Sequence, residues 1–487
     1  MGLASQLGSR FKAAFTAEIV GAISGGALTI LLARLLTPGS YGLLFLALSV
    51  FSVAKLFSAF GVAKSASRYI AEYKETDPGQ IPHILRVALL LNLLTIAIIA
   101  FAFFVGRGPI ATLLNEPDLS PFLLLGSAFI VFSTLTLFVQ QTLQGFEEIR
   151  KASLFTAVDK AGRLIFATGF VLLGYGALGA LVGYIVSYAL IATVGLAYLF
   201  HRGYRQFDFS PIESGLKRKI GEYTIPIAVT QSAHTLDHHI DKVLIGFFVG
   251  PTAVGFYTIG KQVVQFVETP MSALGFTLSP TYGSQKARGN SDTAARIYET
   301  ALSQGLLLYF PAAAGLMILA EPGIRYVFGS EYLGAVPVLQ VLAIFAILQS
   351  VTKLTSHGLD YLGRARDRSI IKGATAVLNF GLNVVLIPIM GVVGAAVATV
   401  VTFAIYTFAN VYIMHLEFDL RVQWLAKQAG YAVLITGLMS VVVVGAAEYI
   451  SGLFTLVSVV LLGVLVWAVF TLYFDLVDTD RLYAMIQ

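Results

Sequence analysis

The chain has 487 residues, of which 57% are hydrophobic and 12% charged, and it carries a formal net charge of +5 with a pI near 9.1. A mean hydropathy of +0.81 excludes a water-soluble globular protein, whose surface needs far more polar residues. The absence of cysteine excludes disulfides, thiolate metal sites and cysteine nucleophiles.

Fourteen apolar stretches of about twenty residues follow one another along the chain, and each is long enough to cross the hydrocarbon core of a bilayer. The predicted spans are 12–35, 41–61, 85–105, 121–143, 154–174, 178–200, 221–249, 254–277, 299–320, 335–357, 369–389, 392–414, 427–447 and 453–474. The sequence therefore predicts an all-α, multi-pass membrane protein with about 14 transmembrane helices.

The charges of the connecting loops predict the orientation of these spans. If the N-terminus is cytoplasmic, the inner loops hold 23 Lys and Arg residues, whereas the outer loops hold only Arg34, Arg107 and Arg325. This asymmetry follows the positive-inside rule and places both termini in the cytoplasm. It also accounts for the basic pI, so the charge gives no reason to expect nucleic acid as a partner.

Three short motifs recur in the same order at nearly the same interval. The paired segments are 38–42 with 251–255, 144–150 with 362–368, and 176–180 with 391–395, at offsets of 213, 218 and 215. Recurrence in order at one offset indicates an internal repeat of two six-helix halves. The alternative is that P-x-x-x-G and G-x-x-G-A are merely common turn chemistry.

The repeat predicts three segments, namely a lobe over 1–204, a second lobe over 205–416, and two extra helices with a cytoplasmic tail over 417–487. Each lobe has an even number of spans, so both enter the membrane from the cytoplasm and the repeat is parallel. Two membrane lobes around a central seam are typical of alternating-access transporters.

These motifs carry a resemblance to a known family. The segments 33–43, 241–246, 254–257, 378–388 and 391–399 resemble the oligosaccharide flippases of polysaccharide biosynthesis, within the multidrug/oligosaccharidyl-lipid/polysaccharide exporter superfamily. The resemblance covers essentially the whole chain, including its fourteen predicted spans. It implies alternating access and a lipid-linked oligosaccharide substrate.

Ionisable side chains inside spans are costly to insert and normally face a cavity or a partner. Among the cations within spans, Lys160 and Lys353 lie close enough to the inner interface for their ammonium groups to reach the headgroups. The others singled out are Lys55, Arg163, Lys242 and Lys261. In a flippase, such cations would pair with the phosphate of the substrate, and arginine is best suited to bidentate contact. We therefore predict these four as candidate phosphate-binding residues.

Span 221–249 concentrates titratable residues near its midpoint. His234, Asp237, His238 and Asp241 share one helical face and, with Glu18 of the first span, are candidates for coupling transport to H⁺ or Na⁺. Two alternatives remain open for this face. The residues could pair with one another only for packing, or His234 and His238 could bind zinc together with Asp241, although no second cluster or base motif completes a metal site.

The predicted function is an alternating-access flippase that carries a polyprenyl phosphate- or diphosphate-linked oligosaccharide across the cell membrane. Its expected partners are the lipid-linked oligosaccharide, membrane lipids and glycan-assembly enzymes, and no cofactor is expected. One alternative is an ion-coupled exporter of drugs or cations. Another is a membrane enzyme such as a polysaccharide polymerase or ligase, but the short outer loops offer no catalytic constellation and no Walker motif is present.

Overall fold

A computed structural model describes residues 3–204, 207, 210–267 and 269–476, except for the side chains of residues 3–11, 13, 203–204, 226, 229–234, 237–238 and 269. Within this described part the chain is helical and contains no strand. The helices are α1 (Leu3–Leu35), α2 (Pro38–Ala59), α3 (Val62–Thr76), α4 (Ile81–Leu113), α5 (Ser120–Gly145), α6 (Ile149–Phe170), α7 (Gly176–Tyr204), α8 (Leu216–Phe248), α9 (Pro251–Val267), α10 (Thr269–Ala287), α11 (Ser291–Ile318), α12 (Ala320–Gly323), α13 (Val336–Tyr361), α14 (Ala365–Met390), α15 (Val392–Phe418), α16 (Val422–Ala447) and α17 (Leu453–Tyr473). Short 3-10 turns include η1 (Pro78–Gln80).

Eleven helical stretches of the described chain are long and apolar enough to cross a membrane. One of them, Ile149–Arg202, contains both α6 and α7. The predicted spans 221–249 and 254–277 are not among the eleven and correspond to α8, which is rich in charged residues, and to the shorter helices α9 and α10. The chain is thus an all-helical, multi-pass membrane protein, and the count of fourteen spans stays a prediction.

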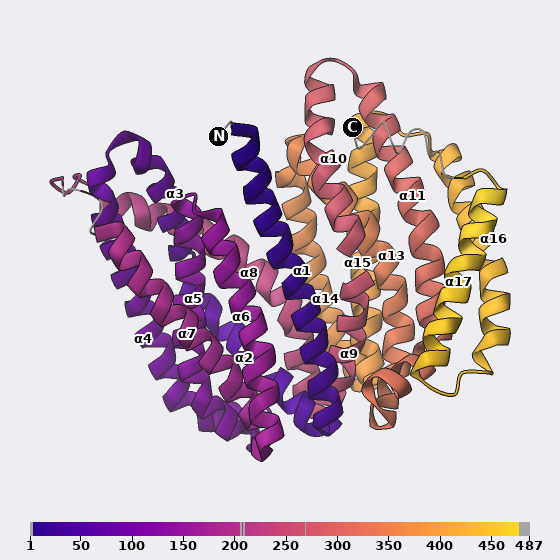
Figure 1. The fold of residues 1–487 in the computed structure, drawn as a ribbon, viewed down its shortest axis with the longest axis horizontal. Helices are drawn as coiled ribbons and strands as arrows, with labels where there is room; N and C mark the ends of the chain where they lie inside the picture. Colours follow the sequence, from indigo (N-terminus) through magenta and orange to yellow (C-terminus); the bar gives the residue numbers. More distant parts are fainter. Residues whose placement is uncertain (1–2, 205–206, 208–209, 268, 477–487) are drawn as a thin grey trace. The chain divides into compact units, whose positions relative to one another are not determined.

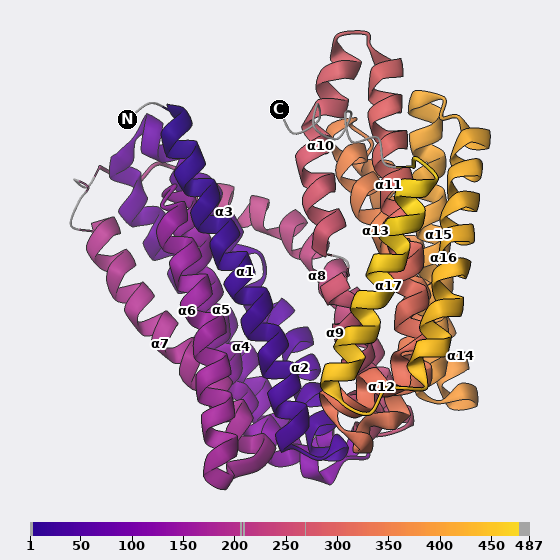
Figure 2. The ribbon, with the colours of Figure 1, turned by 45° about the vertical axis from the view of Figure 1, so that its right-hand side comes forward.

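The chain divides into two compact units, Met1–Gly255 (unit 1) and Phe256–Gln487 (unit 2). In unit 1, α6 packs against α1 and α7, α5 packs against α4 and α7, and α8 packs against α2 and α3. In unit 2, α13 contacts α10, α11 and α15, while α14 pairs with α15. Figures 1 and 2 show the long helices of each unit running side by side. The lobe boundaries at residues 204 and 416 stay a prediction from the repeat.

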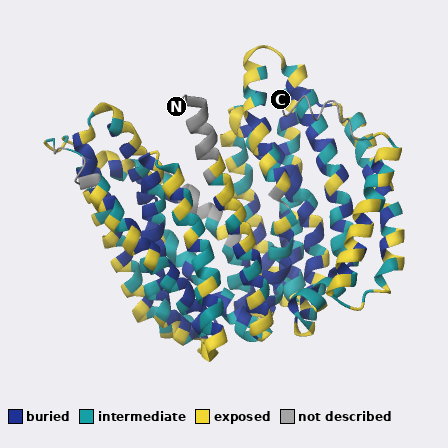
Figure 3. Cartoon of the chain, viewed as in Figure 1, coloured by how far each residue is buried: buried dark blue, intermediate teal, exposed yellow. Residues whose placement is uncertain are grey.

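The last two helices lie at the periphery of unit 2, since α16 packs on α11 and α17 packs on α16. Trp467 on α17 donates from its indole nitrogen to the backbone carbonyl of Leu307 at 2.9 Å. Exposed residues are frequent along both helices in Figure 3, and they include apolar side chains such as Phe454 and Leu465. Apolar side chains on the outside of a membrane helix are expected to face lipid tails.

The G-x-x-G-A motifs form the same turn in both units. Gly176 has φ 55° and ψ −147°, and Gly391 has φ 60° and ψ −143°. Only glycine adopts this backbone region readily. The second glycine of the second motif, Gly394, lies so close to the backbone of Leu386 that a side chain would not fit. The motif therefore closes a tight helical hairpin in each unit, α6–α7 and α14–α15.

The charged loops before these hairpins also have the same backbone turn, but the residues that correspond between the two loops differ from those predicted. The left-handed residue is Glu147 (φ 60°) in the first loop and Gly363 (φ 80°) in the second, which are 216 positions apart. The predicted match of Gly145 with Gly363 is therefore wrong by two residues. Gly145 is instead a packing glycine, because a Cβ there would lie 2.5 Å from the backbone carbonyl of Ser67 on α3.

The P-x-x-x-G motifs begin α2 and α9, and within unit 1 their first turns touch each other. Pro38 and Pro251 occupy the first helical positions, where a missing N–H costs little. A Cβ on Gly255 would lie 2.8 Å from the Pro38 carbonyl oxygen, and a Cβ on Gly42 would run into the backbone of Pro251. Glycine at both positions therefore permits backbone contact between the two motifs.

Candidate functional site

The candidate site is built around an ion pair on α6. Asp159 and Arg163 are one helical turn apart, and Arg163 Nη2 lies 2.6 Å from Asp159 Oδ2. Asp159 is only 3% exposed. The hydroxyl of Ser187 on α7 donates to the Asp159 backbone carbonyl at 2.9 Å and lies 3.4 Å from Asp159 Oδ1. A buried carboxylate with these partners restricts the guanidinium to a narrow range of positions.

The close approach of α7 to α6 depends on a small residue. A Cβ on Gly162 would lie 2.7 Å from Ser187 Oγ, which is tighter than an ordinary contact. Glycine at this position therefore lets the hydroxyl of Ser187 reach the backbone of Asp159 on the same turn of α6.

Two tyrosines of α7 bring a second cation to this ion pair. The Arg163 guanidinium carbon lies 5.1 Å from the ring centroid of Tyr188 and 5.9 Å from that of Tyr184. The Lys55 ammonium of α2 lies 5.9 Å from the Tyr188 centroid. Each distance is within the range of a cation–π contact. We call Lys55, Asp159, Arg163, Tyr184 and Tyr188 the Lys55–Arg163 cluster.

The two cations of this cluster keep donors available. Arg163 Nε is buried and has no hydrogen-bond partner among the described residues. The structure gives the Lys55 ammonium its contact with the Tyr188 ring but no hydrogen bond or ion pair with any described side chain. An anion could therefore satisfy both groups without displacing the Asp159–Arg163 pair.

Glu18 and Lys160 form a separate ion pair beside the cluster. Lys160 Nζ lies 3.6 Å from Glu18 Oε2, so α1 and α6 are linked by opposite charges. The lysine stem fills the space beside Gly21, where a side chain would collide with it. The structure thus gives Glu18, predicted as a coupling residue, a cationic partner on α6.

The two remaining candidate cations have other aromatic neighbours. Lys242 of α8 is in unit 1, and its ammonium lies 5.8 Å from the Phe45 ring centroid. Phe45 is ten residues before Lys55 on α2, a rise of roughly 15 Å along the helix. Lys261 belongs to unit 2, where its ammonium lies 4.9 Å from the Phe345 ring centroid. The structure therefore brings together two of the four predicted phosphate-binding residues.

The titratable face of α8 is described only in part. Asp241 is buried, with 1% of its surface exposed. The side chains of His234, Asp237 and His238 lie outside the described residues. The coupling, packing and zinc interpretations of this face stay predictions.

Sequence reasoning missed the aromatic residues of the cluster. Tyr184 and Tyr188 were not predicted, although they are four residues apart on one face of their helix, the same interval that separates Asp159 from Arg163. That matching interval on consecutive spans is the signal that could have found them. Ser187 gives no comparable signal, because its role depends on the contact between the two helices.

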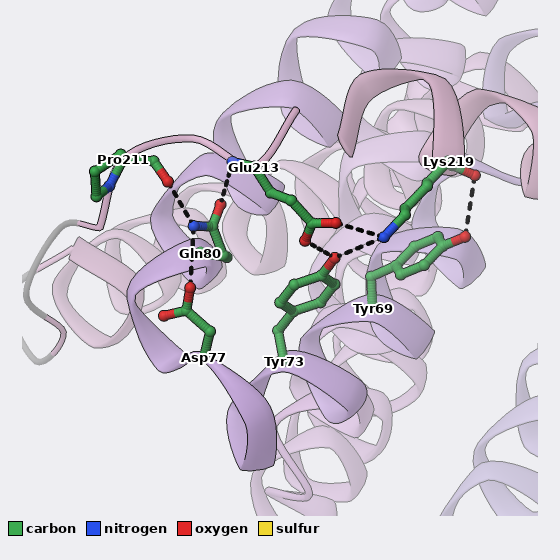
Figure 4. Close-up of polar contacts among 7 residues, drawn as sticks. All are labelled: Tyr69, Tyr73, Asp77, Gln80, Pro211, Glu213 and Lys219. Carbon is green, nitrogen blue, oxygen red and sulfur yellow. Dashed lines mark hydrogen bonds and ion pairs between the residues drawn. The ribbon is translucent and has the colours of Figure 1, made fainter. Parts of the chain in front are cut away.

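A different polar network holds the connection between α7 and α8 (Figure 4). Gln80 of η1 donates to the Pro211 carbonyl at 2.7 Å and to Asp77 Oδ2 at 3.1 Å, and its side-chain oxygen accepts from the Glu213 backbone N–H at 3.0 Å. Gln80 is 2% exposed, so all three bonds are shielded from water. We call these residues, with Tyr69, Tyr73 and Lys219, the linker network.

The other half of the linker network is centred on Glu213. Lys219 Nζ lies 2.5 Å from Glu213 Oε1, the Tyr73 hydroxyl donates to Glu213, and the Tyr69 hydroxyl donates to the Lys219 carbonyl at 3.0 Å. Lys219 and Tyr73 together hold the pKa of the Glu213 carboxyl below its ordinary value. The same contacts raise the pKa of Lys219. These bonds attach the start of α8 to α3 and contain no group placed to act on a substrate.

Unit 2 has a buried polar network without charge. Asn383 Nδ2 donates to Asn379 Oδ1 at 2.9 Å, and Asn379 Nδ2 donates to Thr402 at 3.3 Å. Thr352 and Thr407 share a hydrogen bond of 2.7 Å between α13 and α15. Asn379 of the family-like segment 378–388 therefore joins α14 to α15, as expected for a polar side chain inside a membrane bundle.

Comparison with known families and proteins agrees with this architecture. A family described as polysaccharide biosynthesis protein matches residues 13–281, and a family described as MatE matches residues 226–385. The chain is 25% identical over 452 residues to the probable low-salt glycan biosynthesis flippase Agl15 of Haloferax volcanii, covering 91% of each chain. It is also 25% identical over 412 residues to the lipopolysaccharide biosynthesis protein WzxC of Escherichia coli, covering 83% of this chain and 78% of that protein.

Two solved structures share the fold. The lipid II flippase MurJ in an inward closed conformation has a TM-score of 0.76 at 15% identity, with 96% of this chain and 99% of that chain covered. An inward-facing multidrug resistance transporter of the MATE family has a TM-score of 0.67 at 17% identity, with 84% and 96% covered. At these identities the similarity concerns the fold alone.

Proposed function

The chain belongs to the polysaccharide biosynthesis protein family, and from this we propose that it is a flippase that carries a lipid-linked oligosaccharide across the cell membrane. The phosphate and sugar of such a lipid cannot enter hydrocarbon unaided, because removing them from water is costly, whereas the prenyl tail is stable in lipid. A flippase therefore needs a polar, cationic site among its membrane helices.

The observation that carries the proposal is the Lys55–Arg163 cluster. Two cations from α2 and α6 meet at Tyr188 inside unit 1, and both keep a donor available for an anion. A phosphate group is the part of a lipid-linked sugar that such donors recognise. Names of relatives support the same substrate class, since Agl15 is described as a glycan biosynthesis flippase.

The finer features of the transport cycle belong to the same proposal. We infer fourteen spans, cytoplasmic termini, and alternating access between two parallel lobes. Buried Asp241 is the candidate for coupling to H⁺ or Na⁺, because ionisable residues within membrane helices mark ion pathways and proton relays. Membrane lipids and glycan-assembly enzymes are the inferred partners, and no enzymatic step is assigned to the chain.

Flipping of a fluorescent polyprenyl-phosphate-linked sugar in proteoliposomes tests the proposal. We expect Arg163→Ala to lower the initial flipping rate at least about 30-fold, since loss of one partner of a buried charge pair costs about 2–5 kcal/mol. Arg107→Ala is the matched control, because Arg107 contacts only Phe104 of its own helix among the described residues. Asp241→Asn under an imposed H⁺ or Na⁺ gradient tests coupling.

Two results would contradict the proposal. An equal decrease of the flipping rate in Arg163→Ala and Arg107→Ala would show that the cluster has no special role in transport. Efflux of a cationic dye by the wild-type protein, without any flipping of the sugar lipid, would favour an exporter of the kind to which the MatE match also points.

A further inference from the structure

We propose that the Lys55–Arg163 cluster accepts a phosphodiester with one negative charge, so that the transported lipid carries a monophosphate rather than a diphosphate link. This inference rests on the proposed function and names the chemical class of its substrate. It follows from the balance of charge among the described residues of unit 1 and from the donors that remain available there.

The ionisable groups at the cluster sum to a single positive charge. Asp159 neutralises Arg163 at 2.6 Å, and Glu18 neutralises Lys160 at 3.6 Å. Lys55 is the remaining cation, and its contact is with the neutral ring of Tyr188. Asp241 and Lys242 are also in unit 1, but they are adjacent on α8 and contribute no net charge.

The ligand that balances this charge has one anionic group. A phosphodiester between a prenyl alcohol and a sugar carries one negative charge, whereas the corresponding diphosphate carries two. Among membrane helices, a bound charge without a counter-charge is unfavourable. A monophosphate link leaves the cluster neutral, and a diphosphate link leaves one excess negative charge beside Asp159.

The available donors agree with one phosphate group. The Lys55 ammonium and the Arg163 guanidinium each lie within 6 Å of the same ring centroid, and Arg163 Nε is a buried donor without a partner among the described residues. A second phosphate would need further donors, and two of the other nitrogens here already form ion pairs, Arg163 Nη2 with Asp159 and Lys160 Nζ with Glu18.

The test compares two fluorescent lipids with the same prenyl chain and the same hexose, one linked through a monophosphate and the other through a diphosphate. We expect the wild-type protein in proteoliposomes to flip the monophosphate lipid about tenfold faster, because like charges brought together in a buried site oppose binding. A fluorescent phosphatidylglycerol is a third arm, since it is also a phosphodiester with one charge. Its flipping at the same rate would overturn the assignment of the cluster to a sugar lipid.

Asp159→Asn is the variant that isolates charge. The asparagine keeps the size of the side chain and an oxygen for Ser187, but it raises the net charge of the cluster to two. We expect the ratio of monophosphate to diphosphate flipping to fall about tenfold. Lys55→Gln lowers the net charge to zero and should slow both lipids, and Arg107→Gln should leave the ratio unchanged. Thermal unfolding of each purified variant shows whether it is folded.

The inference and the proposed function fail in different ways. Faster flipping of the diphosphate lipid by the wild-type protein, or an unchanged ratio in folded Asp159→Asn, would overturn the charge assignment and leave the flippase function standing. If the wild-type protein flips neither sugar lipid, the proposed function fails and the inference fails with it.

Discussion

Unit 1 and unit 2 contain the same helical hairpin, closed by an ion pair of opposite polarity. In the α6–α7 hairpin, Glu148 precedes the first helix and its Oε1 lies 3.0 Å from Arg202 Nε near the end of the second. In the α14–α15 hairpin, Arg364 precedes the first helix and its Nε lies 2.6 Å from Glu417 Oε1 near the end of the second. Both hairpins therefore have an ion pair at this place, with the signs of the two positions exchanged.

The side chains in the middle of the two hairpins differ in charge. At an offset of 216, Asp159 and Arg163 correspond to the neutral residues Thr375 and Asn379, and at an offset of 215, Tyr188 corresponds to Phe403. Unit 2 keeps a cation near that ring, since Lys372 Nζ lies 4.3 Å from the Phe403 centroid. The comparison teaches that backbone turns and helix contacts can be kept while the chemistry inside the hairpin changes.

The largest effect on folding is expected at the hairpin turns. Gly176→Ala and Gly391→Ala each force a side chain into a backbone region that is strained for every other residue. Each should destabilise the protein by about 1–3 kcal/mol. Thermal unfolding of the two variants in the same detergent measures this. A loss of stability in one variant only would show that the two turns are not equivalent.

A smaller effect is expected from the ion pair of unit 1. Glu148→Arg places a new cation beside Arg202 and Lys151 and should lower the free energy of unfolding by about 1 kcal/mol. Adding the exchange Arg202→Glu restores a pair of opposite charges and should recover most of this stability. Burial opposes ionisation of Glu148, but hydrogen bonds from Tyr198, Lys151 and Arg202 keep the pKa of the carboxyl below its ordinary value.

A double-mutant cycle on thermal unfolding measures the interaction between these two positions. The matched control is the same exchange in unit 2, with Arg364→Glu and Glu417→Arg. Independent, additive losses in both cycles would show that the opposite polarities of the two pairs have no structural meaning.

The smallest effect is expected from pH at the linker network. The pKa of Glu213 is lowered in the folded protein, so its contribution is present above the unfolded pKa of about 4.3 and is lost as the pH falls through the folded value. The pKa of Lys219 is raised, so its contribution is present below about 10.4 and is lost as the pH rises through the folded value. The network is therefore complete between about pH 4.5 and 10.

Thermal unfolding of the wild type and Glu213→Gln at several pH values checks this. The difference in unfolding temperature between them should be largest near neutral pH. It should shrink as the pH falls below the unfolded pKa of about 4.3 towards the lowered pKa of the folded carboxyl, where the wild-type carboxylate becomes protonated. If the difference in unfolding temperature between the wild type and Glu213→Gln stays constant with pH, Glu213 acts only by packing.

Much of the architecture could be predicted from the sequence. Long apolar runs form helices in a membrane because the backbone has no other source of hydrogen bonds there, so the helices follow from composition and length. The hairpin turns were also readable, because Gly176 and Gly391 stand between two apolar runs and only glycine adopts their backbone angles readily. The register of the charged loops was wrong by two residues because a packing glycine, Gly145, was matched with a turn glycine, Gly363.

The composition of the candidate site was decided by tertiary structure. Helix periodicity alone places Asp159 and Arg163 on one face, since they are four residues apart on one helix. It could not show that Lys55 of α2 approaches Arg163 through Tyr188, or that Lys242 lies elsewhere. Helix periodicity determines which residues share a face, but the packing of side chains between helices determines which faces meet, and that information is distributed over residues far apart in the chain.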